Sequence, residues 1–157
     1  NRILFITGII DEETVATYQA ELMYIANQIT DKKNQAIKIY INSPGGEVYS
    51  AFGLYDVMQS LINKGYIIQT KVMGLAASAS ALILLSGSKG YRSATPHSHI
   101  MIHQPSSETY GTVTDMKIDL EESLRLKEEM IHIINEHTGH ELDEFIERDK
   151  WQHLQLL

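Results

Sequence analysis

Strand-like apolar runs alternate with amphipathic segments along this chain, and the alternation limits the folds open to it. Residues 3–10, 36–42 and 66–74 are rich in β-branched and aromatic side chains, as strands are. Apolar residues at helical spacing follow the first two runs, and a short apolar helix follows the third. The element order βα–βα–βα–ββ–α predicts an α/β fold with a largely parallel sheet and helices on both of its faces.

Local signals mark where these elements begin and end. Asp11 is a candidate N-cap for the first helix, and Gly65 a candidate C-cap for the second. We expect SPGG (43–46) to form a turn and GLAA (74–77) to form a second, tighter one. Further strands are expected within 88–105, the clearest at 99–103. A long amphipathic helix is expected over 114–138, with a shorter one following as far as Asp149.

Composition excludes several classes of protein. With 157 residues we expect a single domain over 1–157. No run approaches the roughly 18 apolar residues of a membrane span, and no signal-peptide pattern opens the chain. A formal charge of −7 argues against nucleic acid as a partner. The absence of cysteine excludes disulfides and thiol catalysis.

Two serines in the stretch GLAASASALILLSG (74–87) are candidate nucleophiles. Ser78 lies where a strand gives way to a helix, a place at which reactive groups gather in open α/β sheets. The free N–H groups of that helix's first turn can stabilise an oxyanion there. A lone serine in this position is more often only an N-cap. Ser80, two residues into the helix, is expected to face the packed interior.

Histidines supply the candidate bases. His103 ends the apolar run MIHQP, which places it at a sheet edge or mouth, although a buried structural histidine would show the same pattern. His97 and His99 form an H-x-H pair without a third ligand at telling spacing, so we treat them as polar loop and strand residues. We expect His137 and His140 to complement the dipole at the end of the long helix.

Three motifs in order resemble those of one known family. INSPGGEVYSAFGLYDVMQ, then GLAASASA, then MIHQP resemble the ClpP family of self-compartmentalised serine proteases. That family reads INSPGG, then G-x-A-A-S, then MIHQP some 25 residues further on, and here Ser78 and His103 are also 25 residues apart. The likeness runs from Arg2 almost to Trp151. It implies a crotonase/ClpP-like spiral of β-β-α units with a long handle helix.

The resemblance also implies a catalytic site. Ser78 would be the nucleophile and His103 the general base, and the N–H groups of Gly46 and Ala79 would form the oxyanion hole. In ERDKW, Asp149 matches the triad acid. An alignment that preserves the family's spacing after HTG would instead set Gln152 or His153 at that place.

This sequence departs from the family pattern beside the nucleophile. The family often has Met-Gly after the serine, whereas this chain has Ala79 and Ser80. We expect that change to alter the wall of the substrate pocket. From the resemblance we expect the family's N-terminal axial segment and its last strand and helix to lack a counterpart in these residues.

Assembly and partners follow from the same resemblance. It implies a homo-oligomer of heptameric rings stacked as a tetradecamer, with the lead-in to the long helix meeting the opposing ring. A hexameric AAA+ Clp unfoldase would feed it unfolded polypeptides and would alone use ATP, so no cofactor is expected for this chain. We also expect a cytoplasmic protein that binds no metal, nucleic acid or membrane. Two alternatives remain open: a catalytically inactive structural subunit of a mixed ring, and a crotonase-type acyl-CoA enzyme.

Overall fold

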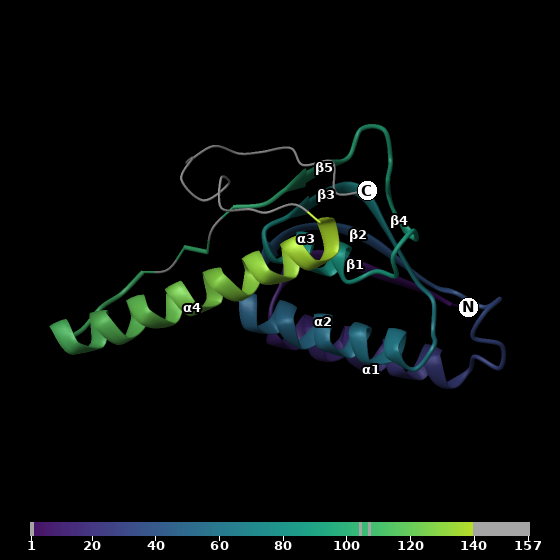
Figure 1. Cartoon of the computed structure of the whole chain (residues 1–157), viewed down its shortest axis with the longest axis horizontal. Helices are drawn as coiled ribbons and strands as arrows, with labels where there is room; N and C mark the ends of the chain where they lie inside the picture. Colours follow the sequence, from purple (N-terminus) through teal and green to yellow (C-terminus); the bar gives the residue numbers. More distant parts are fainter. Residues whose placement is uncertain (1, 104, 107, 140–157) are drawn as a thin grey trace.

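A computed structural model describes residues 2–103, 105–106 and 108–139, and Figure 1 shows their arrangement. The elements follow the predicted order of three strand–helix pairs, two short strands and a long helix. They are β1 (Ile3–Ile10), α1 (Glu12–Asn27), β2 (Ile37–Gly46), α2 (Val48–Asn63), β3 (Ile68–Ala77), α3 (Ala79–Leu85), β4 (Arg92–Ala94), β5 (His99–Met101) and α4 (Val113–Thr138).

The pairs of strands in the described part of the chain are parallel, in agreement with the prediction of a largely parallel sheet. Its order is β1-β2-β3-β4, and β5 also pairs with β3. Strand β3 is long enough to take both partners, with β4 beside its first half and β5 beside its last three residues. The carboxyl ends of β2, β3 and β5 therefore come together at one edge of the sheet.

Within residues 2–139 as the structure describes them, the helices cover one face of this sheet, which corrects the expectation of helices on both. Helix α1 packs on β1 and α2, and α3 packs on α2, β2 and β3, so these three helices form one layer. Burial alternates along the strands accordingly, with Phe5 and Lys38 exposed beside buried neighbours. The buried strand residues facing the helices are Leu4, Ile6, Ile37, Ile39, Ile41, Ile68, Thr70 and Val72.

Both predicted turns beside the site are extended backbone instead. SPGG continues β2 to Gly46, and LAA continues β3 to Ala77. The register of β2 shifts against both neighbours in this region, between Ile41 and Ser43 on the β3 side. Glycine and proline here accommodate irregular pairing and do not reverse the chain.

The helix ends agree with the sequence signals. Asp11 caps α1, its carboxylate accepting the N–H of Thr14 at 2.9 Å while the Thr14 hydroxyl accepts the N–H of Asp11. Gly139 ends α4 in the left-handed conformation, with a φ of 73°. Helix α4 thus matches the predicted long helix to within one residue.

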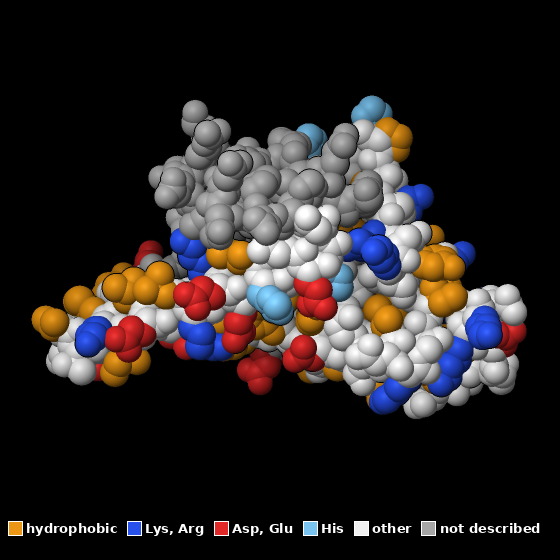
Figure 2. Space-filling model, viewed as in Figure 1, with side chains coloured by type: hydrophobic (Ala, Val, Ile, Leu, Met, Phe, Trp, Pro, Cys, Tyr) orange, Lys and Arg blue, Asp and Glu red, His pale blue; other side chains and the backbone are white. Residues whose placement is uncertain are grey.

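Helix α4 projects beyond the rest of the molecule (Figure 1). Its 26 residues span about 39 Å, yet its buried residues, Met130 and Ile134, both lie in its C-terminal third. The N-terminal part exposes apolar side chains, which Figure 2 shows gathered along the projecting helix. The most exposed are Val113 at 84%, Ile118 and Leu120 at 58%, and Leu124 at 49%. No helix in the described part of the chain is long and apolar enough to cross a membrane.

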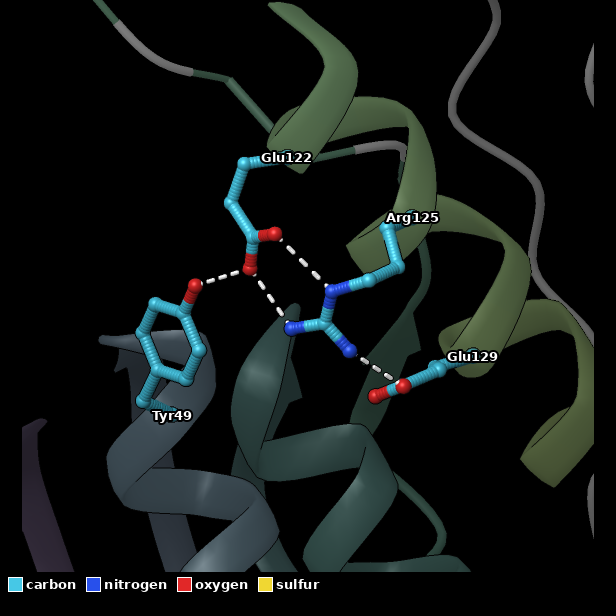
Figure 3. A network of polar contacts seen from close by, with 4 residues as sticks. All are labelled: Tyr49, Glu122, Arg125 and Glu129. Atoms are coloured by element: carbon cyan, nitrogen blue, oxygen red, sulfur yellow. Dashed lines mark hydrogen bonds and ion pairs between the residues drawn. The ribbon is translucent and has the colours of Figure 1, made fainter. Parts of the chain in front are cut away.

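A charged network joins the middle of α4 to the start of α2 (Figure 3). Arg125 lies between Glu122 and Glu129, and Glu122 also accepts the hydroxyl of Tyr49. Hydrogen bonds from Arg125 and then Tyr49 lower the pKa of Glu122 to about 2. Because all four side chains are at the surface, each of these contacts contributes little to stability.

Candidate active site

Ser78 occupies a strained backbone position at the end of β3. Its φ of 56° and ψ of −125° make it the single non-glycine residue with positive φ among the described residues. It precedes α3, but its side chain makes no capping hydrogen bond. The interpretation of Ser78 as a simple N-cap is therefore wrong. Strain of this kind persists where surrounding structure imposes it, and it is concentrated at functional sites.

The glycines of SPGG lie in close contact with two neighbours: Gly45 with the turn at Ser78, and Gly46 with β1. A Cβ on Gly45 would lie 2.4 Å from the carbonyl oxygen of Ala77 and 2.9 Å from the Cβ of Ser78. A Cβ on Gly46 would lie 2.1 Å from the carbonyl oxygen of Ile10. Only glycine allows the end of β2 to approach both neighbours so closely.

The end of β2 at Gly46 and Glu47 is bonded to β1. Glu47 donates its N–H to the carbonyl of Ile10 at 2.8 Å, and Gly46 is the residue paired with Ile10. Gly46 is exposed, whereas Gly45 is buried. The N–H of Ala79, in the first turn of α3, follows Ser78 directly.

His103 follows the strand next to Ser78. Ala77 and Met101 are register partners, and the N–H of Ser78 donates to the carbonyl of Met101 at 2.8 Å. Ser78 and His103 thus lie one and two residues beyond the paired ends of parallel strands, at the same edge of the sheet. The predicted strand over 99–103 is shorter than expected and ends at Met101. His103 is exposed, so it is not a buried structural histidine.

Ser80 and Ala79 are both fully buried. The prediction that Ser80 faces the interior is confirmed, and its hydroxyl bonds to the carbonyls of Ser43 and Ala77. The expectation that Ala79 and Ser80 alter the wall of a substrate pocket is wrong, because neither side chain reaches the surface. Their departure from the family pattern lies beneath the site.

Two contributors to the site were missed in the sequence. Ser43 is buried, donates its hydroxyl to the carbonyl of Gly8 at 2.6 Å and accepts the N–H of Gly45 at 3.0 Å. Gly45 is the glycine in contact with the Ser78 turn. Both lie in the SPGG motif, but a strand bulge held by its own serine has no distinct sequence signal. Asp149, Gln152 and His153 lie outside the described residues, as does His140.

His137 has a different environment from the one expected. Its Nε2 lies 2.7 Å from the hydroxyl of Tyr55, and its carbonyl accepts a hydrogen bond from Arg92 at 3.0 Å. Burial, and then the charge of Arg92, lower the pKa of His137, while burial raises the pKa of Tyr55 to about 12. His137 is therefore neutral near pH 7 and joins α4 to α2, so the prediction of a cation on the helix dipole is wrong.

Metal ligands do not cluster near the site: within 2–103, 105–106 and 108–139, no three of His, Asp and Glu come together as a metal site would require. The chemistry available at the sheet edge is that of a hydroxyl, an imidazole and backbone N–H groups. That combination suits acyl transfer through a tetrahedral oxyanion.

Known proteins match almost the whole chain. Residues 1–155 match the family model described as Clp protease. The chain belongs to the Clp protease family. A Bacteroides fragilis protein named ATP-dependent Clp protease proteolytic subunit is 41% identical over 96% of this chain and 72% of its own length. A protein of the same name from Porphyromonas gingivalis is 40% identical over 96% of this chain and 67% of its own length.

Family membership confirms the fold and the class of activity. The mixed α/β architecture with a parallel sheet and a long terminal helix is that of a Clp protease. The protein is accordingly a peptidase of the serine class, a hydrolase of peptide bonds.

Proposed function

We propose that this Clp protease cleaves peptide bonds with Ser78 as nucleophile and His103 as general base. The N–H groups of Gly46 and Ala79 form the oxyanion hole, and Asp149 is the acid that orients His103. The observation that carries the proposal is the strained Ser78 backbone, held by Met101 of the strand that leads to His103.

The reaction proceeds in two halves. The Ser78 oxygen attacks the scissile carbonyl while His103 takes the proton of the Ser78 hydroxyl. The oxyanion of the tetrahedral intermediate accepts hydrogen bonds from the two N–H groups. Collapse breaks the C–N bond, and His103 returns the proton to the leaving amine. Water, deprotonated by His103, then hydrolyses the ester on Ser78 and regenerates the enzyme.

Two backbone features support the oxyanion hole. Gly46 is exposed at the end of β2, and the N–H of Ala79 lies in the first turn of α3, where N–H groups have no partner within the helix. Both belong to backbone whose position is fixed by packing, as preorganised stabilisation requires. Gly45 helps to fix the backbone of Ser78 and Ala79 by its close contact with this turn.

The protein acts as part of an assembly. We propose heptameric rings stacked as a tetradecamer, because the exposed apolar residues of projecting α4 need a partner surface of their own kind. Its relatives carry the name of a subunit of an ATP-dependent protease. We infer that an AAA+ Clp unfoldase supplies unfolded polypeptides in the cytoplasm and consumes the ATP, and that this chain needs no cofactor.

Substitution of Ser78 tests the proposal directly. Ser78→Ala should lower hydrolysis of a short fluorogenic peptide by at least about a thousandfold, because no other step replaces the covalent one. Ser60→Ala, an exposed serine on α2, is the matched control and should retain full activity. Peptidase activity retained by Ser78→Ala would refute the assignment.

The triad acid requires its own comparison. Asp149→Asn should lower kcat by a large factor while leaving KM near its original value, because the acid orients His103 and does not bind substrate. Asp143→Asn makes the same change of charge and chemistry six residues earlier, and should leave kcat unchanged. Equal kcat values for the two variants would remove Asp149 from the triad and direct the search to Gln152 or His153.

A further inference from the structure

Ser80 has a hydroxyl engaged on two sides of the candidate site. It lies in the first turn of α3 and is inaccessible to solvent. Its Oγ lies 2.8 Å from the carbonyl oxygen of Ala77 and 2.9 Å from that of Ser43. A bond to a carbonyl three residues earlier is common for serine in a helical turn. The bond to Ser43 is of another kind, because it crosses to a strand 37 residues away in sequence.

This crosslink lies where the pairing of β2 and β3 stops. Ser43 and Ala76 are the last register partners of the two strands. Beyond them β2 continues through the glycine pair and β3 reaches Ala77. Ser80 Oγ therefore connects the carbonyl two residues before Gly45 with the carbonyl immediately before Ser78.

Ser43 extends the same connection to β1. Its hydroxyl donates to the carbonyl of Gly8 and accepts the N–H of Gly45. Buried hydroxyls thus join β1, the SPGG segment and the Ser78 turn in one chain of hydrogen bonds. Within the described residues no buried side-chain polar atom lacks a partner, so the chain is fully satisfied.

We propose that Ser80 is a positioning residue that fixes the oxyanion-hole N–H of Gly46 relative to the nucleophile. The inference rests on the roles proposed above for Ser78 and Gly46. A donor stabilises the oxyanion fully only when it is held in place before charge develops, and small displacements lower the rate. A glycine, which the family often has here, would lack this hydroxyl. The crosslink is therefore a feature of this chain.

The test compares Ser80 with the buried serine that caps the C-terminal end of the same helix. Ser86 directly follows α3 and is also fully buried, at the end of the helix remote from Ser78. Its hydroxyl donates to the carbonyl of Ile83 at 2.6 Å and lies 3.0 Å from the sulfur of Met58. Each alanine variant loses one buried hydroxyl. We measure kcat and KM for a short fluorogenic peptide, and the rate of fluorophosphonate labelling of Ser78, at a temperature at which both assembled proteins are fully folded.

Ser80→Ala should lower kcat and the labelling rate about tenfold, a fraction of the hundred- to thousandfold lost with a whole oxyanion donor. Its KM should change less than about twofold, because substrate binding elsewhere is unaffected. Ser86→Ala should keep both rates within about twofold of the wild type. If Ser80 had only a structural role, both alanine variants would have a lower melting temperature and their kcat values would be equal.

A second pair of variants covers failure of Ser80→Ala to fold. Ser80→Cys and Ser86→Cys keep nearly the same shape and replace the hydroxyl with a weak donor. Ser80→Cys should again be the slower of the two. Equal kcat values within either pair would overturn the positioning role while leaving labelled Ser78 as nucleophile. Failure of fluorophosphonate to label Ser78 in the wild type would overturn both proposals.

Discussion

The backbone around Ser78 and the long helix α4 are held in contrasting ways. Ser78 is surrounded by buried small residues, a register pair and hydroxyl bonds to carbonyls, with Gly45 in direct contact. Helix α4 is held by two buried residues near its C-terminal end, by the contacts of His137 with Tyr55 and Arg92, and by surface charges. Its N-terminal part projects beyond the rest of the molecule. The first region suits chemistry, which needs fixed geometry, and the second suits assembly, which needs an exposed apolar surface.

Substitution of Gly45 should have the largest effect on the rigid backbone around Ser78. Gly45→Ala places a Cβ 2.4 Å from the Ala77 carbonyl, at a φ of 92°. We expect a loss of about 3 kcal/mol or more in the free energy of unfolding, together with most of the activity. Chemical denaturation and peptide hydrolysis measure the two effects.

Gly65 provides the matched control for that substitution. Its φ is 88°, and a Cβ there would meet nothing within 4 Å. Gly65→Ala should therefore cost only the backbone strain, about 1–2 kcal/mol, and leave kcat unchanged. If the two variants lost equal stability, the close approach of β2 to the Ser78 turn would have no energetic consequence.

Secondary structure at the site shows the limits of sequence reasoning. Periodicity and capping residues predicted the element order, the Asp11 cap and the full length of α4, because these signals are local. SPGG and GLAA, in contrast, have the composition of turns, and their extended form depends on pairing with distant strands. Local composition does not encode such pairing.

The candidate site shows the same division. The order and spacing of three motifs made Ser78, His103 and Gly46 the candidate residues, and the strand ends bring their backbones to one edge. The supporting roles proposed for Gly45, Ser43 and Ser80 depend on contacts across 32 to 37 residues of sequence, which no motif records. His137 was misjudged for the same reason, since Tyr55 lies 82 residues away.

Assembly through α4 is the next largest expected effect. Ile118→Asp introduces a charge at an exposed apolar position of the projecting helix. Light scattering should show a smaller particle, with the midpoint of assembly moved to at least about tenfold higher concentration. The free energy of unfolding of the single chain should not change, because Ile118 contributes nothing to its core.

Lys117→Gln is the control for this variant. It changes the net charge by the same amount at the neighbouring exposed residue, but it removes no apolar contact. Its assembly midpoint should stay close to the wild-type value. A normal particle from Ile118→Asp would mean that this face of α4 is not an assembly surface.

The smallest expected effect concerns the contact between α4 and the body at His137. Because the folded-state pKa of His137 is lowered, the unfolded chain binds a proton more readily. This contribution to stability is complete above about pH 6.5 and declines as pH falls below it. Thermal unfolding between pH 7.5 and 5.5 should show that decline, and His137→Gln should reduce its slope. An unchanged slope in that variant would contradict the assignment.

Tyr55→Phe sharpens the same comparison at neutral pH. Removing the hydroxyl that bonds with His137 should cost about 1 kcal/mol in the free energy of unfolding and leave kcat within about twofold. A loss of kcat well beyond twofold would show that α4 and the site are coupled, contrary to the separation of the two regions.

The measurement that tests the central claim most directly is fluorophosphonate labelling of the wild-type protein, followed by peptide mapping of the modified residue. Only a serine activated by a base and facing an oxyanion hole should react. The account predicts one adduct per chain, on Ser78, which disappears in His103→Ala. An adduct on another serine, or none at all, would contradict it, and the second result would favour a structural subunit without catalytic activity.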